Sequence, residues 1–339
     1  MNKKAVVLLS GGLDSTLAVK ILQRQGIEIE AINFQTMFGC CKDDARQVAY
    51  ELGIKFTMIP VGMDYVELVK KPKYGVGKGI NPCVDCRIYM FRLGKKFMQT
   101  IGASFVVSGE VLGQRPMSQR SDCFESIERD AELEGLIVRP LSAKLLEPSL
   151  PEKEGIVNRE QLYDIEGRSR SRILQLAKEY GIENPPSPST GCALTEPEFA
   201  KKVRDIFKHS TDYERWHFEI LKTGRHFRLD QETKLVLGRD ESENEYLEYL
   251  HPPGTTLLTP LNFAGPSGLL IGESSEGAAP VGTIHQPPLL KQAGEIILSY
   301  TKHRPAEPPQ IRWELNHSTG VVEVQAGLEE SVLSPLKIT

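Results

Sequence analysis

The strongest constraint on this chain is an apolar run near its N-terminus that ends in two consecutive glycines. Residues 5–9 are all apolar, Ser10-Gly11-Gly12 follow, and the next apolar residues recur at helical spacing. This pattern predicts a buried strand, a tight turn and a helix. Glycines let the backbone of such a turn approach a ligand, and the free N–H groups that begin a helix attract an anion. The sequence therefore predicts a phosphate-binding turn.

The residues around this turn narrow its chemistry. The segment Ser10-Gly11-Gly12-Leu13-Asp14-Ser15 supplies two hydroxyls and a carboxylate but lacks the lysine of a P-loop. It resembles the pyrophosphatase loop (PP-loop) of enzymes that cleave ATP between its α and β phosphates and transfer AMP to a substrate oxygen. The resemblance implies that ATP binds here and that Asp14 is a partner of Mg²⁺. A glycine-rich turn without a ligand is the alternative. The implied ATP-binding residues are Ser10, Gly11, Gly12, Asp14 and Ser15.

The segments that follow predict the fold of this region. An apolar strand is expected over 27–34, a helix over 43–53 and a third strand over 55–60. Strands alternating with helices predict an α/β fold with a doubly wound parallel sheet, which binds ligands beyond the carboxyl ends of its strands. In PP-loop proteins the end of the second strand holds the adenine, so the resemblance implies that Asn33, Phe34 and Gln35 contact the nucleotide.

Length and composition indicate a second domain. A prior of roughly 150 residues per domain suggests two domains in 339 residues. We expect the first over 1–210 and a smaller, mostly β domain over 211–339, where short strand signals alternate with turns and one helix is expected over 288–300. The stretch from Gly238 to Leu247 resembles a small NFACT-type RNA-binding module of ribosome-associated quality-control proteins. The second domain is therefore expected to bind tRNA or a partner.

Targeting signals are missing from the sequence. The first four residues are too short and polar for a signal peptide, and no apolar run approaches the ~18 residues of a membrane span. We therefore expect a cytoplasmic protein without membrane contact, in which the six cysteines serve metal binding or reactivity more than disulfides. The net charge of −4 argues against indiscriminate nucleic-acid binding but allows local basic patches. The oligomeric state stays open, a homodimer included.

Two cysteine motifs carry the second chemical signal. Cys83 and Cys86 follow Asn-Pro and begin a helical pattern, so both thiols can reach one metal or cluster. Cys192 lies in Ser-Thr-Gly-Cys-Ala-Leu-Thr after a proline-rich stretch. The two motifs resemble the paired cysteine motifs of tRNA uridine thiolases, which activate a uridine with ATP and replace its carbonyl oxygen by sulfur. The adjacent Cys40 and Cys41 are expected to be structural or incidental.

A third motif refines the resemblance. The segment from Ser108 to Gln119 contains Gly109 and Gln114 in an order similar to that of tRNA 4-thiouridine sulfurtransferases, more than to that of the wobble 2-thiouridylases. The resemblance implies that Gly109 and Gln114 belong to the nucleotide site. Together, these motifs cover roughly residues 5 to 208.

Three interpretations of the cysteines stay open. In the first, Cys83, Cys86 and Cys192 hold a [4Fe–4S] cluster with one iron free to carry sulfide, as the resemblance to cluster-dependent thiolases implies. In the second, no metal is used: Cys192 accepts a persulfide from a cysteine desulfurase and Cys86 acts as nucleophile or resolving thiol. In the third, zinc takes a fourth ligand such as Asp85. We favour the cluster because Cys83 has no role in a two-cysteine scheme.

The sequence thus predicts an ATP-dependent tRNA sulfurtransferase that forms 4-thiouridine. Its catalytic residues would be Asp14, Cys86 and Cys192, its cofactors ATP, Mg²⁺ and the cluster, and its sulfur donor free sulfide or a desulfurase persulfide. Alternatives are a persulfide-based 2-thiouridylase, a PP-loop amidotransferase or nucleobase synthase acting on a small molecule, and a non-catalytic RNA-binding factor. Alternating arginines around the start of a helix predict a tRNA-facing surface in which some members form ion pairs and others meet phosphate. These arginines are Arg168, Arg170 and Arg172.

Overall fold

The computed structural model describes residues 1–38, 44–183, 192–272, 287–302 and 307–338. The chain folds into two compact units, Met1–Thr195 and Glu196–Thr339. Within the described ranges, no helix is both long enough and apolar enough to cross a membrane.

The first unit is built on a five-stranded sheet in which every neighbouring pair is parallel. The strand order is β3-β2-β1-β4-β5, so β1 has its sequence neighbour on one side and a strand from much later in the chain on the other. This makes the edge between β1 and β4 the topological switch point of the sheet, where such folds bind ligands. The strands are β1 (Lys4–Leu8), β2 (Glu28–Gln35), β3 (Lys55–Pro60), β4 (Phe105–Ser108) and β5 (Ile137–Val138).

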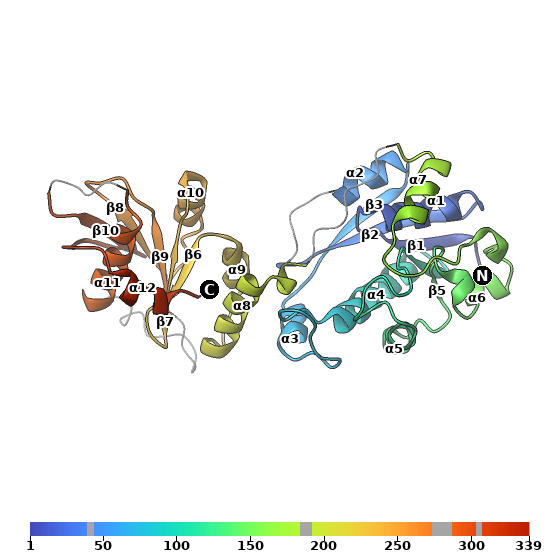
Figure 1. The fold of residues 1–339 in the computed structure, drawn as a ribbon, viewed down its shortest axis with the longest axis horizontal. Coiled ribbons are helices and arrows are strands. Elements are labelled where there is room, and N and C mark those ends of the chain that lie inside the picture. Colours follow the sequence, from blue (N-terminus) through green and yellow to red (C-terminus); the bar gives the residue numbers. More distant parts are fainter. Residues whose placement is uncertain (39–43, 184–191, 273–286, 303–306, 339) are drawn as a thin grey trace. The chain divides into compact units, whose positions relative to one another are not determined.

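Helices cover both faces of this sheet (Figure 1). Ala5 and Val7 of β1 point into a core shared with α1 and α7, whereas Val6 and Leu8 point into the core beneath α4 and α5. The doubly wound parallel sheet predicted from the sequence is therefore confirmed. The helices of this unit are α1 (Leu13–Gln23), α2 (Asp44–Glu51), α3 (Asp64–Lys70), α4 (Cys83–Thr100), α5 (Ser121–Ala131), α6 (Leu150–Lys153) and α7 (Ser171–Glu179).

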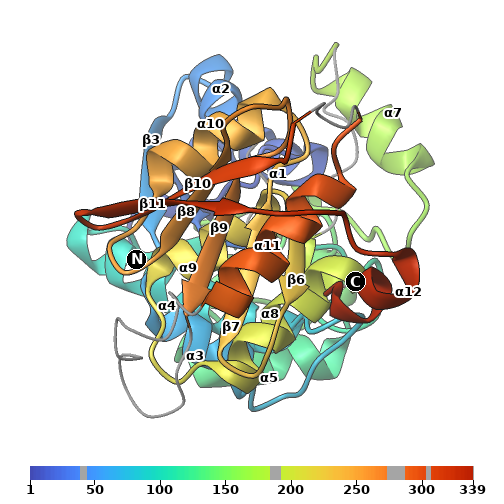
Figure 2. The same ribbon diagram turned by 90° about the vertical axis from the view of Figure 1, so that its left-hand side faces the viewer.

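The second unit is built on a six-stranded antiparallel sheet of order β11-β10-β8-β9-β7-β6. The apolar face of α11 packs across one side of it, and α10 contributes Leu247 to the core on the other side (Figure 2). The elements are α8 (Pro197–His209), α9 (Arg215–Glu219), β6 (Arg225–Arg228), β7 (Thr233–Leu237), α10 (Glu241–Leu250), β8 (Thr256–Pro260), β9 (Gly268–Gly272), α11 (Pro287–Ser299), β10 (Gln310–Leu315), β11 (Ser318–Glu323) and α12 (Glu330–Leu333).

The division between the units lies earlier than the boundary at 210/211 expected from composition. Helix α8 belongs to the second unit, because its Asp205 pairs with Arg228 of β6 and its Lys202 Nζ donates to the Leu221 carbonyl at 3.1 Å. Helix α10 and the hairpin β10–β11 were not anticipated either. The hairpin strands are half exposed and mixed in polarity, which leaves little periodic signal.

Candidate functional site

The predicted phosphate-binding turn is present between β1 and α1. Gly11 has a φ of 76°, which favours glycine, and Gly12 precedes the first helical residue. The Ser15 hydroxyl donates to the Gly12 carbonyl at 2.9 Å and lies 3.2 Å from the Ser10 hydroxyl. The Ser10 hydroxyl in turn accepts from the Gly12 N–H at 3.3 Å. Local hydrogen bonds therefore fix the turn before any ligand arrives.

Gly109 closes this turn from the neighbouring strand. It follows β4, and a Cβ built at this position would lie 2.5 Å from the Ser15 amide nitrogen. Only a glycine allows the end of β4 to approach the first turn of α1 so closely. The structure thus places Gly109 against the first turn of α1 at the switch point, and its membership in the nucleotide site stays a prediction.

Asp14 lies at the same point and has one unsatisfied oxygen. Its Oδ2 accepts from Gln114 Nε2 at 3.0 Å, whereas its Oδ1 is buried without a hydrogen-bond partner among the residues that the structure describes. Burial raises the pKa of this carboxyl, against the lowering effects of Gln114 and of the positive charges of Arg170 and Arg115. A buried acceptor without a donor is costly, so Oδ1 suits a cation or a ligand donor. Mg²⁺ fits this oxygen chemistry.

The end of β2 is held by hydrogen bonds to neighbouring segments. Asn33 Nδ2 donates to the Leu9 carbonyl at 2.7 Å and its Oδ1 accepts from the Phe34 N–H at 2.5 Å. The Gln35 carbonyl accepts from the Val61 N–H at 3.1 Å. These bonds hold the edge beside the phosphate-binding turn, and the half-buried Phe34 and exposed Gln35 leave side-chain surface for a base.

Cys83 and Cys86 occupy the first turn of α4, as the sequence predicts. Both are half-buried, and being three residues apart they share one face of the helix. Cys86 Sγ accepts a hydrogen bond from the Tyr65 hydroxyl of α3 at 3.0 Å. Tyr65 is itself buried and packs edge-on to Tyr89. Sequence reasoning missed Tyr65, since nothing near it in the chain signals a site.

Cys192 is connected to the same region by backbone contacts. The Ile80 N–H donates to the Leu194 carbonyl at 3.0 Å, which attaches the segment after Cys192 to the loop before Cys83. Gly79 makes this approach feasible, because a Cβ there would meet the Leu194 carbonyl oxygen at 2.2 Å. Residues 184–191, with the proline-rich stretch and the Ser-Thr-Gly that precede Cys192, lie outside the described residues, as do Cys40 and Cys41.

The three thiols are close enough to affect one another electrostatically. Burial raises the pKa of Cys192 to about 11, and the charges of Cys86 and Cys83 contribute to the increase. Burial also raises the pKa of Cys83 and of Cys86, while the nearby Arg87 acts in the opposite direction. Without a bound cation, all three are therefore thiols at neutral pH.

Asp85 is not placed to complete a zinc site with the cysteines. Both Asp85 oxygens accept backbone N–H groups, from Lys73 at 2.9 Å and from Tyr74 at 3.0 Å, so the zinc interpretation loses its fourth ligand. Among the described residues, no group of three cysteine, histidine or acidic side chains is placed to hold one metal ion. A cluster binds each cysteine to a different iron, so its ligands are spaced more widely than those of a single ion.

A buried ion-pair network lies behind the thiols. Glu110 is 2% exposed in its side chain and lies between Arg87 Nε at 3.4 Å and Arg139 Nε at 3.3 Å. Arg139 also pairs with Glu128 and covers the ring of Phe124 at 3.9 Å. The network joins the end of β4 to α4 and α5.

The motif of the second unit has a structural explanation. Asp240 Oδ1 accepts from the Glu243 N–H at 3.0 Å and caps α10, Arg239 pairs with Glu243, and Leu247 is fully buried. A Cβ at Gly238 would lie 2.1 Å from Asn244 Oδ1. The stretch from Gly238 to Leu247 therefore forms a capped helix start packed on the sheet.

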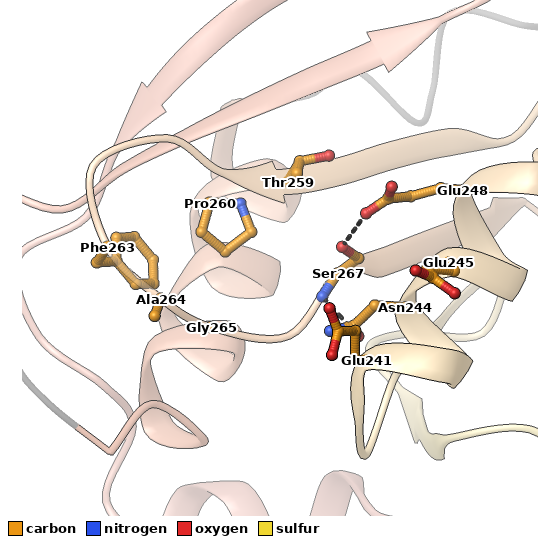
Figure 3. Close-up of a pocket in the computed structure, with 10 residues that line it drawn as sticks. All are labelled: Glu241, Asn244, Glu245, Glu248, Thr259, Pro260, Phe263, Ala264, Gly265 and Ser267. Carbon is orange, nitrogen blue, oxygen red and sulfur yellow. Dashed lines mark hydrogen bonds between the residues drawn. The ribbon is translucent and has the colours of Figure 1, made fainter.

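A pocket of about 350 Å³ lies beside the same helix (Figure 3). Glu241, Glu245 and Glu248 line one side of it, and Pro260 and Phe263 the other. Glu248 accepts from the Ser267 hydroxyl at 2.6 Å. Three carboxylates repel phosphate, so this pocket is unsuited to an RNA backbone.

Comparison with family models matches the two units separately. Residues 1–147 match the model described as thiamine biosynthesis protein (ThiI), and residues 224–332 match the NFACT protein RNA binding domain. Each match covers less than half of the chain.

Curated relatives that are similar to part of this chain are tRNA-specific 2-thiouridylases. The chain is 31% identical over 131 residues to a tRNA-specific 2-thiouridylase MnmA of Clostridium acetobutylicum, over 32% of this chain and 36% of the relative. It is 27% identical over 235 residues to a tRNA-specific 2-thiouridylase MnmA of Clostridioides difficile, over 62% of this chain and 60% of the relative. The aligned stretches thus span about a third to three fifths of these relatives' length.

Similar solved structures include a 4-thiouridine synthetase–RNA complex with bound ATP, at 22% identity and a TM-score of 0.38, covering 65% of this chain and 51% of that one. Another is the C-terminal part of a fibronectin/fibrinogen-binding protein from Streptococcus suis, at 12% identity and a TM-score of 0.26, covering 81% of this chain and 98% of that one. The sequence matches carry the conclusion: the chain resembles PP-loop tRNA uridine thiolases in its first unit and the NFACT RNA-binding domain in its second.

Proposed function

We propose that this chain is an ATP-dependent tRNA sulfurtransferase that converts a uridine to 4-thiouridine. The observation that carries the proposal is the joining of two sites in one unit. A phosphate-binding turn holds a carboxylate with an unsatisfied oxygen, Asp14 Oδ1. In the same unit Cys83 and Cys86 begin α4, and the segment after Cys192 is hydrogen-bonded to the loop before Cys83. A small-molecule PP-loop amidotransferase needs the first of these and not the second.

The activation step uses the turn at β1. The N–H groups of Gly11, Gly12 and the start of α1 would bind the phosphates, and Asp14 would hold Mg²⁺ through Oδ1. The uridine carbonyl oxygen attacks the α-phosphorus, the bond to the β-phosphate oxygen breaks, and pyrophosphate leaves with the electron pair. The positive environment of the turn stabilises the charge on the leaving group.

The sulfur step uses the thiol side of the site. Hydrosulfide attacks the adenylated carbon, and AMP leaves with the former carbonyl oxygen, so that uridine, ATP and hydrogen sulfide yield thiouridine, AMP and pyrophosphate. Cys83, Cys86 and Cys192 would hold a [4Fe–4S] cluster, which supplies an iron without a protein ligand to bind sulfide.

The competing proposal is a 2-thiouridylase that uses a persulfide in place of a cluster, and the relatives named 2-thiouridylases support the 2-thiouridine product. There the outer sulfur of a Cys192 persulfide, delivered by a desulfurase, attacks the activated carbon and AMP leaves. The Cys86 thiolate then attacks Cys192 Sγ, the thiouridine sulfur leaves, and a thiol reductant reduces the resulting Cys86–Cys192 disulfide. The second unit, matched to an RNA-binding domain, would hold the tRNA in either route.

Anaerobic iron reconstitution tests the proposal, with thiolation of an unmodified tRNA transcript followed by nucleoside mass spectrometry. We compare the wild type with Cys83→Ala, Cys86→Ala and Cys192→Ala, and use Cys123→Ala as the control because Cys123 is buried elsewhere and donates to the Met117 carbonyl. About four irons per chain, lost in the three variants together with 4-thiouridine, are expected. If iron-free protein thiolates tRNA from a persulfide donor, the proposal of a cluster is wrong. If the product is 2-thiouridine, the proposed position of thiolation on the uridine is wrong.

A further inference from the structure

Two segments that are distant in sequence lie side by side next to the phosphate-binding turn. Leu112 forms a parallel bridge with Glu166, and the Gly167 N–H donates to the Leu112 carbonyl at 2.7 Å. Each segment then carries an arginine a few residues further on, Arg115 on one and Arg170 on the other. The topology thus brings two guanidinium groups from separate parts of the chain to one region.

Neither arginine is neutralised within the described structure. The side chains of Arg115 and Arg170 make no hydrogen bond or ion pair there, and Arg115 is exposed. Their sequence neighbours behave differently: Arg120 pairs with Asp122, and Arg172 pairs with Asp164 at 2.7 Å. Arg115 and Arg170 are therefore available to bind a ligand, whereas Arg120 and Arg172 are already engaged in ion pairs.

The available cations lie near the predicted chemistry. Gln114, which precedes Arg115, donates to Asp14, and Met117 in the same loop packs against Gly77 in the loop that leads to Cys83. The positive charge of Arg115 lowers the pKa of Asp14, Cys83 and Cys192 against the dominant effect of burial, and that of Arg170 lowers the pKa of Asp14. Arg115 therefore lies within electrostatic reach of both the nucleotide turn and the thiols.

We propose that Arg115 and Arg170 bind a phosphate group beside Asp14, with Arg115 on the side of the thiols. A guanidinium fork matches phosphate oxygens in charge and geometry, and an unpaired arginine loses little by binding one. The phosphate comes from ATP, as part of the nucleotide or of the adenylated intermediate, or from the backbone of the bound RNA. This inference rests on the proposed function for its substrates, but its test requires no turnover.

Binding assays on the full chain test it with two ligands. The first is α,β-methylene ATP with Mg²⁺, which cannot be cleaved at the α–β bond, and the second is an unmodified tRNA transcript titrated at several salt concentrations. We compare Arg115→Gln and Arg170→Gln with the matched controls Arg120→Gln and Arg172→Gln. Thermal unfolding of each variant verifies that the fold is retained.

Each outcome decides the proposal. About tenfold weaker binding of the ATP analogue in Arg115→Gln or Arg170→Gln, with both controls near wild type, assigns the site to nucleotide phosphate. Weaker tRNA binding with a salt slope reduced by about one assigns it to the RNA backbone. Unchanged affinity for both ligands in both variants overturns the proposal. If the wild-type protein binds both ligands but forms no thiouridine, that result contradicts the proposed function. It does not contradict the proposed phosphate site.

Discussion

The two halves of the candidate site are assembled in different ways. The phosphate-binding turn is held by hydrogen bonds among Ser10, Gly12 and Ser15, and Gly109 and Gln114 approach it from a later segment. The thiol site instead draws Cys86, Tyr65 and Cys192 from three separate segments. A locally built site is specified by consecutive residues, whereas an assembled site depends on the packing of the whole unit.

The largest expected effect comes from filling the space where the end of β4 approaches the turn. Gly109→Ala would place a Cβ 2.5 Å from the Ser15 backbone nitrogen, closer than real side chains approach. We expect a loss of about 3 kcal/mol of unfolding free energy and no measurable binding of an ATP analogue, because α1 must shift. Thermal unfolding and calorimetric titration measure both.

Gly94→Ala is its matched control. Gly94 lies in α4, and a Cβ at this position would make an ordinary 3.6 Å contact with Ile32 Cδ1 of β2. Alanine also favours a helix more than glycine does. Wild-type nucleotide affinity in Gly109→Ala would show that β4 does not constrain the turn.

Asp14→Asn separates the chemistry of the turn from its stability. We expect thiolation to fall about 100-fold, since a charged group at the phosphates is lost. Stability should rise at neutral pH, because the folded-state pKa of Asp14 is above its ordinary value of 3.8. A carboxyl of this kind stabilises the fold only where it is protonated, and this contribution is lost as the pH rises through its folded pKa.

Urea unfolding from pH 4 to pH 8 and tRNA thiolation assays provide the readouts for Asp14→Asn. Asp122→Asn, at an exposed ion pair, is the control and should change neither quantity appreciably. Asp14→Asn protein with full activity would remove this carboxylate from the mechanism.

Tyr65→Phe tests the thiol site, which is assembled from separate segments of the chain. It removes the hydroxyl that donates to Cys86, which should cost about 1 kcal/mol of stability. The hydrogen bond lowers the pKa of Cys86 against the effect of burial, so its loss should move alkylation of Cys86 to higher pH. Mass spectrometry of iodoacetamide-treated, iron-free protein gives the profile.

Tyr89→Phe is the control for this substitution, because the Tyr89 hydroxyl donates to Asp64 and not to a cysteine. Equal alkylation profiles in the two variants would argue that Tyr65 has no specific effect on the thiol.

The smallest effect is expected in the second unit. Asp240→Ala removes the cap of α10 and should cost about 1 kcal/mol, with tRNA affinity unchanged. Thermal unfolding and filter binding measure the two quantities. Weaker tRNA binding at full stability would assign this motif to RNA recognition and not to capping.

Much of the first unit follows from local signals. The β1 run, the glycine turn, β3 at Lys55–Pro60 and the start of α4 at Cys83 all match the expectation. Continuous apolar runs and helical periodicity are strong there because the sheet is covered on both faces. The half-exposed hairpin β10–β11 gave no such signal. The contacts that attach α8 to the second unit, through Asp205 and Lys202, are not visible as a sequence pattern.

The sequence by itself determined the chemistry that is present: a glycine turn with a carboxylate, and three cysteines in two motifs. The tertiary structure decided which groups meet. In the tertiary structure Gly109 packs against α1, and the Tyr65 hydroxyl donates a hydrogen bond to Cys86. Asp85 accepts hydrogen bonds from backbone N–H groups and does not face a metal site with the cysteines. The physical reason is the separation in sequence of the groups that interact. Hydrogen bonds and periodicity within one turn are encoded by consecutive residues. The approach of distant segments depends on how the sheet and its helices pack.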